Sequence, residues 1–212
     1  MHITTVLFDI GNVLSHDGHE TYLTHEHYGL ARELGLPKDE VTAKVNHLFR
    51  KYAVREHASE AEFWGEIGNA LGLKLSPEAI AEVKTRITTT NAEAIEAFKF
   101  LRKRGIKIGI ISNSTPLFYE KQTEPLLLNQ YADPALLFLS HKRGVLKSNG
   151  LFEKAASSVD PSSTYIIEDR AKNVAYAQSL GFHAVEYSME SGESLLTVVR
   201  RIVETPHTAA KE

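Results

Sequence analysis

The sequence predicts an α/β protein in which a doubly wound parallel sheet is interrupted by an all-helical insert. The run Thr4–Asp9 is β-branched and apolar without polar alternation, as expected for a strand that is covered on both faces. From about residue 91 onward, segments with helical periodicity alternate strictly with short apolar runs. Between these two parts, residues 20–90 show helical periodicity alone. The sheet is therefore expected to combine two separated stretches of the chain.

The insert is expected to contain four helices. Their apolar spacing places them at residues 28–34, 41–52, 59–71 and 76–87. Asp39 precedes the second helix, and Ser59 and Glu62 have the spacing of a capping box at the start of the third. Pro77, which follows Ser76, occupies a first helical position. This block is predicted to be a unit of its own.

The remainder of the chain is expected to supply the sheet and the helices that cover it. The expected helices are residues 92–104, 151–158, 171–180 and 194–203, and the expected strands are 106–112, 136–139, 164–167 and 183–185. Gly105 and Gly181 follow two of these helices as stop signals. The predicted organisation is a core domain of residues 1–16 and 91–204, a helical cap of residues 17–90, and a flexible C-terminal tail of residues 205–212.

The composition excludes several classes of protein. Of the 212 residues, 42% are hydrophobic, which is enough to bury a substantial core. The absence of cysteine excludes disulfides, thiolate chemistry and Cys-ligated zinc. No stretch approaches the ~20 apolar residues of a membrane span, and the first residues lack a secretion signal, so a cytoplasmic protein is expected. A net charge of −3 with dispersed Lys and Arg argues against nucleic acid as a partner.

Polar residues gather where the predicted strands end, which is where doubly wound sheets bind ligands. The segments that carry these polar residues are Phe8–Leu14, Ile110–Ser114, Gly144–Lys147 and Ile166–Arg170. In this order they resemble the four motifs of the haloacid dehalogenase (HAD) superfamily, and the resemblance covers nearly the whole chain. The cap has the size and position of the capped subfamily I, and the first motif, Asp-x-Gly-Asn-Val, is similar to a branch that includes sugar-phosphate phosphatases. The resemblance implies a Rossmann-like, HAD-like core.

The resemblance also implies a Mg²⁺-dependent phosphatase that acts on a small phosphorylated metabolite. Asp9 is then the nucleophile that forms an aspartyl-phosphate. The implied metal ligands are Asp9, Asp169 and the backbone carbonyl of Gly11, and Glu168 is expected near the metal, through water or as a support for Lys147. Taken alone, a strand-end aspartate is more often a turn or cap residue, so this assignment depends on the motifs together.

The implied phosphate-binding residues come from three of the motifs. The hydroxyl of Ser112 donates to a phosphate oxygen, and the amide of Asn113 orients the substrate or the phosphate. Lys147 cancels negative charge as the nucleophile approaches phosphorus, although most single lysines lie at the surface. Gly11 and Asn12 are assigned to the same phosphate-binding set. Asp9, Ser112 and Lys147 are the predicted catalytic residues.

The sequence departs from the family pattern at two positions. Gly11 stands where most superfamily phosphatases carry a second aspartate, which protonates the leaving group and later activates water. General acid–base catalysis is typically worth about 10²–10⁴-fold, so a slow enzyme or a substitute group is expected. His16, Asp17 or His19 is a candidate proton shuttle by position alone. Ser148 stands where the family usually has proline.

Two other functions stay open. A 2-haloacid dehalogenase uses the same aspartate against carbon and needs no metal, but the acidic pair Glu168–Asp169 argues against it. A non-catalytic member that binds a phosphorylated ligand or a protein is the other alternative, supported by Gly11 and Ser148. The sequence does not name the substrate. It is compatible with a homodimer.

Overall fold

A parallel sheet forms the centre of the molecule. The computed structural model describes residues 2–16, 29–78, 80–81 and 90–204. The strands are β1 (Thr5–Phe8), β2 (Lys107–Ser112), β3 (Leu137–Leu139), β4 (Thr164–Glu168) and β5 (His183–Glu186), in the order β3-β2-β1-β4-β5. Strand β1 lies in the middle and pairs in parallel with β2 and β4, which follow the insert in sequence. The predicted α/β class with a doubly wound parallel sheet is confirmed.

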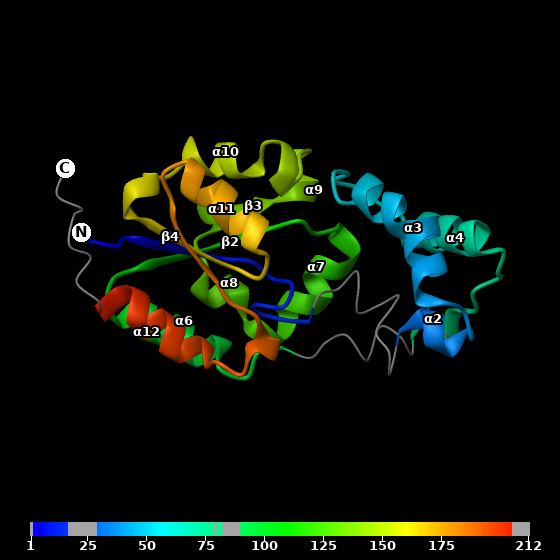
Figure 1. Cartoon of the computed structure of the whole chain (residues 1–212), viewed down its shortest axis with the longest axis horizontal. Helices are drawn as coiled ribbons and strands as arrows, with labels where there is room; N and C mark the ends of the chain where they lie inside the picture. Colours follow the sequence, from blue (N-terminus) through cyan, green and yellow to red (C-terminus); the bar gives the residue numbers. More distant parts are fainter. Residues whose placement is uncertain (1, 17–28, 79, 82–89, 205–212) are drawn as a thin grey trace.

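Helices cover both faces of this sheet (Figure 1). On one face, Val6 and Phe8 of β1 pack with residues of α6 (Ala94–Lys103) and α12 (Leu195–Glu204). On the other face, Leu7 belongs to a cluster with residues of α10 (Leu151–Ala156) and α11 (Ala171–Ser179). Successive side chains of β1 therefore enter two different apolar layers, which is why its sequence shows no polar alternation.

The insert has a hydrophobic core of its own. Its helices are α2 (Leu30–Glu33), α3 (Lys38–Tyr52) and α4 (Glu60–Leu71), which lie beside the sheet domain in Figure 1. Ser59 is the N-cap of α4, as half of a capping box, because its side chain accepts a hydrogen bond from the Glu62 amide at 3.4 Å. The Glu62 side chain pairs instead with Arg55. Helix α3 begins earlier than predicted, with Pro37 at its N-cap, so Asp39 lies in the first turn and is not the cap. The predicted cap boundary segments 17–28 and 82–89 and the tail 205–212 lie outside the described residues.

One aromatic side chain of the core domain packs into the insert. Phe118 lies on α7 (Pro116–Thr123), and its ring centroid is 6.1 Å from that of Phe49 and 5.8 Å from that of Phe63. Leu117, also on α7, is partly buried against the same cluster. The insert therefore rests on the helix that directly follows β2.

Helix α7 was not predicted. Its start is marked locally, since Thr115 accepts a hydrogen bond from the Phe118 amide and Pro116 occupies the first helical turn. Short helical turns complete the core: η1 (Glu124–Leu126), α8 (Leu128–Tyr131), η2 (Pro134–Leu136), α9 (Ser140–Arg143), η3 (Lys147–Asn149), η4 (Pro161–Ser163) and η5 (Met189–Ser191). Among the described residues, none of the helices is both long and apolar enough to span a membrane.

Candidate active site

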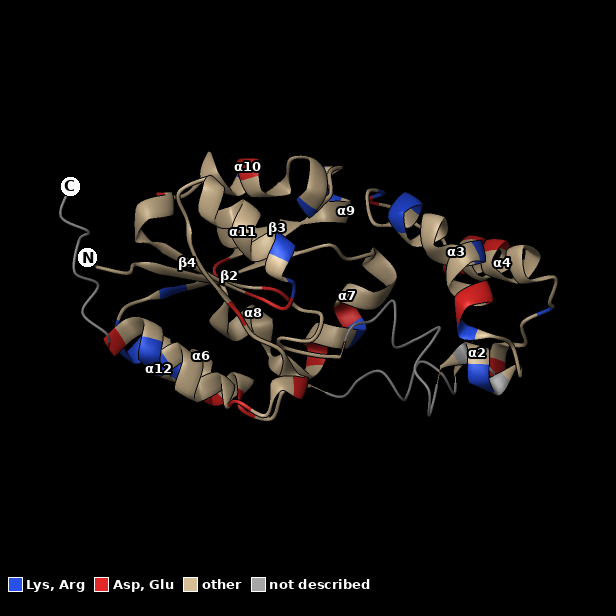
Figure 2. Cartoon of the chain, in the orientation of Figure 1, with Lys and Arg blue, Asp and Glu red and all other residues tan. Residues whose placement is uncertain are grey.

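The acidic residues of the predicted site follow two neighbouring strands. Asp9 comes directly after β1, Glu168 is the last residue of β4, and Asp169 comes directly after it. The strands are held in register through Phe8 and Ile167, and the Asp9 amide donates to the Ile167 carbonyl at 2.9 Å. From β1 the chain adds β2 and then β3 on one side, and it adds β4 and β5 on the other side of β1. Ligands of doubly wound sheets bind where the order of strands switches in this way, here between β1 and β4. Figure 2 shows acidic positions at these strand ends.

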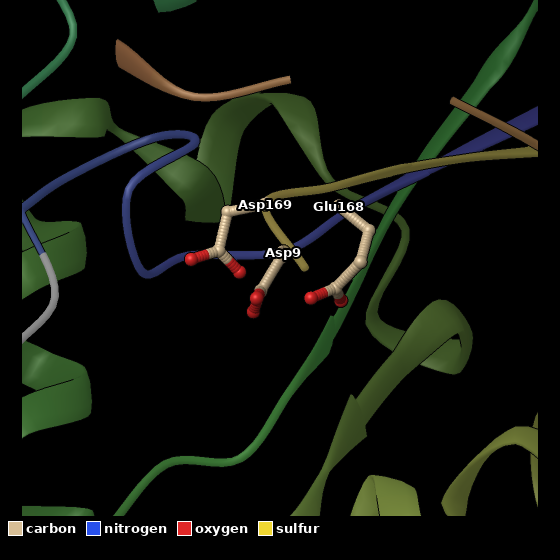
Figure 3. Close-up of side chains that lie close together, drawn as sticks. All are labelled: Asp9, Glu168 and Asp169. Atoms are coloured by element: carbon tan, nitrogen blue, oxygen red, sulfur yellow. The ribbon is translucent and has the colours of Figure 1, made fainter. Parts of the chain in front are cut away.

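The side chains of Asp9, Glu168 and Asp169 converge on one another (Figure 3). Each offers a carboxylate oxygen, and these oxygens all lie within 4.8 Å of one another. Glu168 is fully buried and Asp9 is 7% exposed, so water screens little of their repulsion. Two buried carboxylates and the half-buried carboxylate of Asp169, at this separation, are a donor set of the kind that a hard divalent cation such as Mg²⁺ takes. The residues present fit a bound Mg²⁺ ion.

The acidity of these groups reflects the crowding of negative charge. Burial, with the charge of Glu168, raises the pKa of Asp9 to about 6. Burial, with the charge of Asp9, raises the pKa of Asp169 to about 8. Both carboxylates are therefore hard to ionise together in the absence of a cation, and a bound cation would favour their ionised forms.

Lys147 is buried between two of these carboxylates. Its Nζ lies 2.7 Å from Asp9 Oδ2 and also pairs with Glu168 Oε2, while Glu168 Oε1 accepts from Asn173 Nδ2 at 2.8 Å. Burial favours a higher pKa for Glu168, but the charge and hydrogen bond of Lys147 outweigh it and hold that pKa below its ordinary value. Burial alone would lower the pKa of Lys147, yet the charges of Asp9 and Glu168 raise it. One ammonium among three carboxylates leaves an excess of two negative charges when all are ionised.

The turn after β1 brings a further side chain to this cluster. Asn12 has a positive φ of 55°, a conformation that asparagine tolerates better than most residues, and its carbonyl accepts from the Met189 amide at 2.7 Å. Its Nδ2 donates to Asp169 Oδ2 at 3.2 Å. Asn12 therefore contacts a carboxylate of the cluster, and its assigned contact with phosphate stays a prediction. The role of the Gly11 carbonyl as a ligand likewise stays a prediction.

The loop after β2 lies on the other side of Asp9. Ser112 is 3% exposed at the end of the strand, and its hydroxyl is close enough to Asp9 to favour the ionised carboxylate. The neighbouring Asn113 uses Oδ1 to accept from the backbone amide of Lys147 at 2.8 Å. The structure thus brings Ser112, Asn113 and Lys147 together with Asp9, and the catalytic and phosphate-binding roles assigned to them stay predictions.

Residues of α9 support this loop, a role that no pattern in the sequence indicates. Ser140 and His141, at the start of α9, make side-chain hydrogen bonds to Ser114. Neither residue belongs to the four motifs described for the sequence. Strand pairing explains the contact, because β3, which ends just before α9, lies beside β2.

The candidate proton shuttles are only partly within the described residues. The His16 carbonyl accepts from Gln122 Nε2 at 2.9 Å, which ties this segment to α7. Asp17 and His19 lie outside the described part of the chain. The hypothesis that one of these three residues moves a proton stays a prediction.

Comparisons with known proteins place the chain among hydrolases. The model of the haloacid dehalogenase-like hydrolases matches residues 3–181. No curated protein matches the chain. Among solved structures, a predicted HAD-like family hydrolase from Porphyromonas gingivalis is 23% identical with a TM-score of 0.74, covering 97% of this chain and 100% of that chain.

Two further solved structures represent different chemistries. A HAD family enzyme from Bacteroides thetaiotaomicron, in complex with magnesium and inorganic phosphate, is 20% identical with a TM-score of 0.70, covering 90% of this chain and 96% of that chain. The L-2-haloacid dehalogenase from Xanthobacter autotrophicus, with chloropropionic acid covalently bound, is 18% identical with a TM-score of 0.56, covering 99% and 92%. At these identities the likeness shows the fold alone.

Proposed function

The chain belongs to the haloacid dehalogenase-like hydrolase family, and on that premise we propose that it is a Mg²⁺-dependent phosphatase that acts on a small phosphorylated metabolite through an aspartyl-phosphate on Asp9. The observation that carries this proposal is the cluster of Asp9, Glu168 and Asp169 with the ammonium of Lys147 beside Asp9. Sugar phosphates are the first substrates to test, because the first motif is similar to that of sugar-phosphate phosphatases.

Asp9 is suited to attack phosphorus. Its Oδ1 is held by the Ile10 amide at 2.7 Å and its Oδ2 by Lys147 Nζ at 2.7 Å, so the carboxylate has a fixed orientation. The bond that forms joins a carboxylate oxygen to phosphorus, and the bond that breaks joins phosphorus to the ester oxygen of the leaving group. Water then hydrolyses the acyl-phosphate and releases inorganic phosphate and free Asp9.

The surrounding donors reduce the repulsion between the carboxylate and the phosphate. Lys147 places a buried positive charge beside Asp9, and Ser112 supplies a hydroxyl on the β2 side. Such groups, fixed before the reaction, stabilise negative charge that develops at the phosphoryl oxygens. Asp9, Asp169 and the Gly11 carbonyl would hold Mg²⁺ with Glu168 next to them, and the bound ion would neutralise charge on the phosphoryl group.

Dehalogenation of a 2-haloacid is the second candidate, since the structural neighbours include L-2-haloacid dehalogenases. The acidic cluster opposes it. A 2-haloacid brings its own carboxylate, and a site with three carboxyl groups and one ammonium would disfavour a further anion unless a cation were bound. We therefore rank phosphate-ester hydrolysis first.

The test is turnover of an aryl phosphate by purified protein with Mg²⁺ and with EDTA. The wild-type protein is expected to release phenolate only with Mg²⁺, and Asp9→Asn to abolish turnover. Asp160→Asn is the matched control, because Asp160 is an exposed aspartate that caps η4 outside the site. Unchanged turnover in Asp9→Asn would refute the proposal, and chloride release from 2-chloropropionate without metal would favour the dehalogenase.

A further inference from the structure

The loop that carries Ser112 and Asn113 is fixed by a buried set of hydrogen bonds behind it. Ser140 Oγ accepts from the Ser114 amide at 3.0 Å and lies 3.2 Å from the Ser114 carbonyl, to which it donates. Nδ1 of His141 lies 2.9 Å from the same carbonyl and 3.1 Å from Ser114 Oγ. All three residues are buried, with exposed fractions of 2% for Ser114, 0% for Ser140 and 4% for His141.

The geometry determines which nitrogen of His141 carries the hydrogen. A backbone carbonyl can only accept, so the 2.9 Å contact with the Ser114 carbonyl requires a hydrogen on Nδ1. The Ser114 carbonyl then accepts from both Ser140 and His141, which uses both of its lone pairs. A buried carbonyl without these donors would lose the hydrogen bonds that offset its burial, so the peptide between Ser114 and Thr115 has one strongly preferred orientation. The preceding peptide, between Asn113 and Ser114, is held by its own amide, which donates to Ser140 Oγ.

The surroundings of His141 favour the neutral imidazole. Burial lowers the pKa of His141, although its hydrogen bond to the Ser114 carbonyl and the charge of Glu56 act in the opposite direction. Its ring packs against that of Tyr119 on α7, with the centroids 5.8 Å apart, and Lys142 adds a positive charge nearby. The ring is therefore held by α7 on one side and bonded to the loop on the other.

The orientation of this peptide affects the position of two residues of the candidate site. Asn113, immediately before Ser114, accepts from the backbone amide of Lys147, and Ser112 before it lies beside Asp9. A shift of the Ser114 peptide would move Ser112 and Asn113 together and would disturb the hydrogen bond to Lys147. A displacement of about 1 Å in a positioned group can cost on the order of 10²-fold in rate.

We propose that His141 is a positioning residue that, through Ser114, holds Ser112 and Asn113 in place for phosphate binding. This inference rests on the proposed phosphatase function and adds to it a residue that none of the four motifs contains. His141 does not itself contact the phosphate in this proposal. Its side chain acts only by donating from Nδ1 to the Ser114 carbonyl.

Three variants of His141 separate this role from plain packing. His141→Asn can place an amide hydrogen near the position of Nδ1, His141→Gln carries its amide farther out, near the position of Nε2, and His141→Leu has no donor. The matched control is His183→Leu, because Nε2 of His183 also contacts a carbonyl, that of Ser162, at 3.1 Å, but near the start of β5, away from the strand ends that form the site.

The measurements are kcat and KM for an aryl phosphate with Mg²⁺, the inhibition constant of inorganic phosphate, and the Tm of each variant. His141→Leu is expected to lower kcat/KM by about 10- to 100-fold and to weaken phosphate inhibition. His141→Asn is expected to recover most of both, and His141→Gln much less. His183→Leu should leave both at the wild-type level.

Several results would overturn the inference. One is a His141→Leu protein with a lower Tm but wild-type kcat/KM and phosphate inhibition, which would make His141 a packing residue only. If His141→Leu does not fold, equal activity of His141→Asn and His141→Gln overturns it, and higher activity of His141→Asn supports it. A wild-type protein that neither turns over the ester nor binds inorganic phosphate with Mg²⁺ would overturn the proposed function as well.

Discussion

Asn12 donates its side-chain amide to Asp169 Oδ2 at 3.2 Å, which links two residues that are 157 positions apart in the sequence. The link depends on the backbone, because Asn12 has a φ of 55° and its carbonyl accepts from the Met189 amide. Asp169 is thereby held in place from the turn that follows β1. In the proposed phosphatase, this hydrogen bond would orient Asp169 for metal binding before the ion arrives.

Replacement of Asn12 by glycine is expected to weaken Mg²⁺ binding by about 10- to 100-fold, the usual cost of losing a partner that orients a metal ligand. Glycine adopts the same positive φ without strain, so the fold and the Met189 contact should be kept. Calorimetric titration of Mg²⁺ into both proteins measures the effect. Asn12→Gly with the affinity of the wild type would show that Asp169 needs no such support.

Lys147 is expected to be essential for stability as well as for turnover. Lys147→Met leaves Asp9 and Glu168 buried without their cation, and breaking a buried pair in this way costs about 3–5 kcal/mol. The double variant Lys147→Met/Glu168→Gln removes one of the two stranded charges and should recover part of that loss without recovering turnover. Urea unfolding of the wild type and both variants measures it. Equal stability of the two variants would contradict this explanation.

The sheet could be predicted because its strands are apolar on both faces. Leu7 and Phe8 enter different apolar layers, and that arrangement leaves a continuous apolar run in the sequence. Helix α7 was missed for the opposite reason. Its segment follows β2 without a clear apolar stripe. Its buried side chains, such as Phe118, pack against the insert, whose residues are distant in the sequence.

The site was predicted in its residue types more fully than in its contacts. The resemblance indicated Asp9, Lys147 and Asp169, but no pattern shows that a lysine will be 2% exposed. The support of Ser114 by His141 could not be predicted, because it follows from the pairing of β2 with β3. A buried histidine at the start of a four-residue helix leaves no periodic signal in the sequence.

The stability that Asp169 contributes to the metal-free protein is expected to fall as the pH rises toward 8, and the last part of this loss is expected between pH 7 and pH 9. The pKa of Asp169 lies at about 8 in the folded chain and near its ordinary value of 3.8 when unfolded. A raised pKa means that the folded state keeps a proton that the unfolded state has lost. Its contribution to stability is therefore complete below pH 3.8 and is lost as the pH rises through about 8. The pKa of Asp9, raised to about 6, titrates mostly below this window.

Bound Mg²⁺ should reverse this trend, because the ion favours the ionised carboxylates. The Tm measured with EDTA should decrease from pH 7 to pH 9, and the gain in Tm caused by excess Mg²⁺ should increase over the same range. Asp169→Asn is the control, since it has no proton to lose at this position. The same pH dependence in Asp169→Asn would assign the effect to another group.

Introduction of an acid at position 11 is expected to increase turnover. Gly11 stands where most superfamily phosphatases have a second aspartate, and a general acid–base is worth about 10²–10⁴-fold. The backbone permits the change, because Asn12 but not Gly11 is among the residues with positive φ. Gly11→Asp should therefore raise kcat for an alkyl phosphate, whose leaving group needs a proton, far more than for an aryl phosphate.

Gly11→Asn is the control of equal size without an acidic proton. If Gly11→Asp leaves kcat unchanged while Mg²⁺ still binds, the wild-type chain already has an effective acid, and the removal of His16, Asp17 and His19 one at a time becomes the deciding experiment.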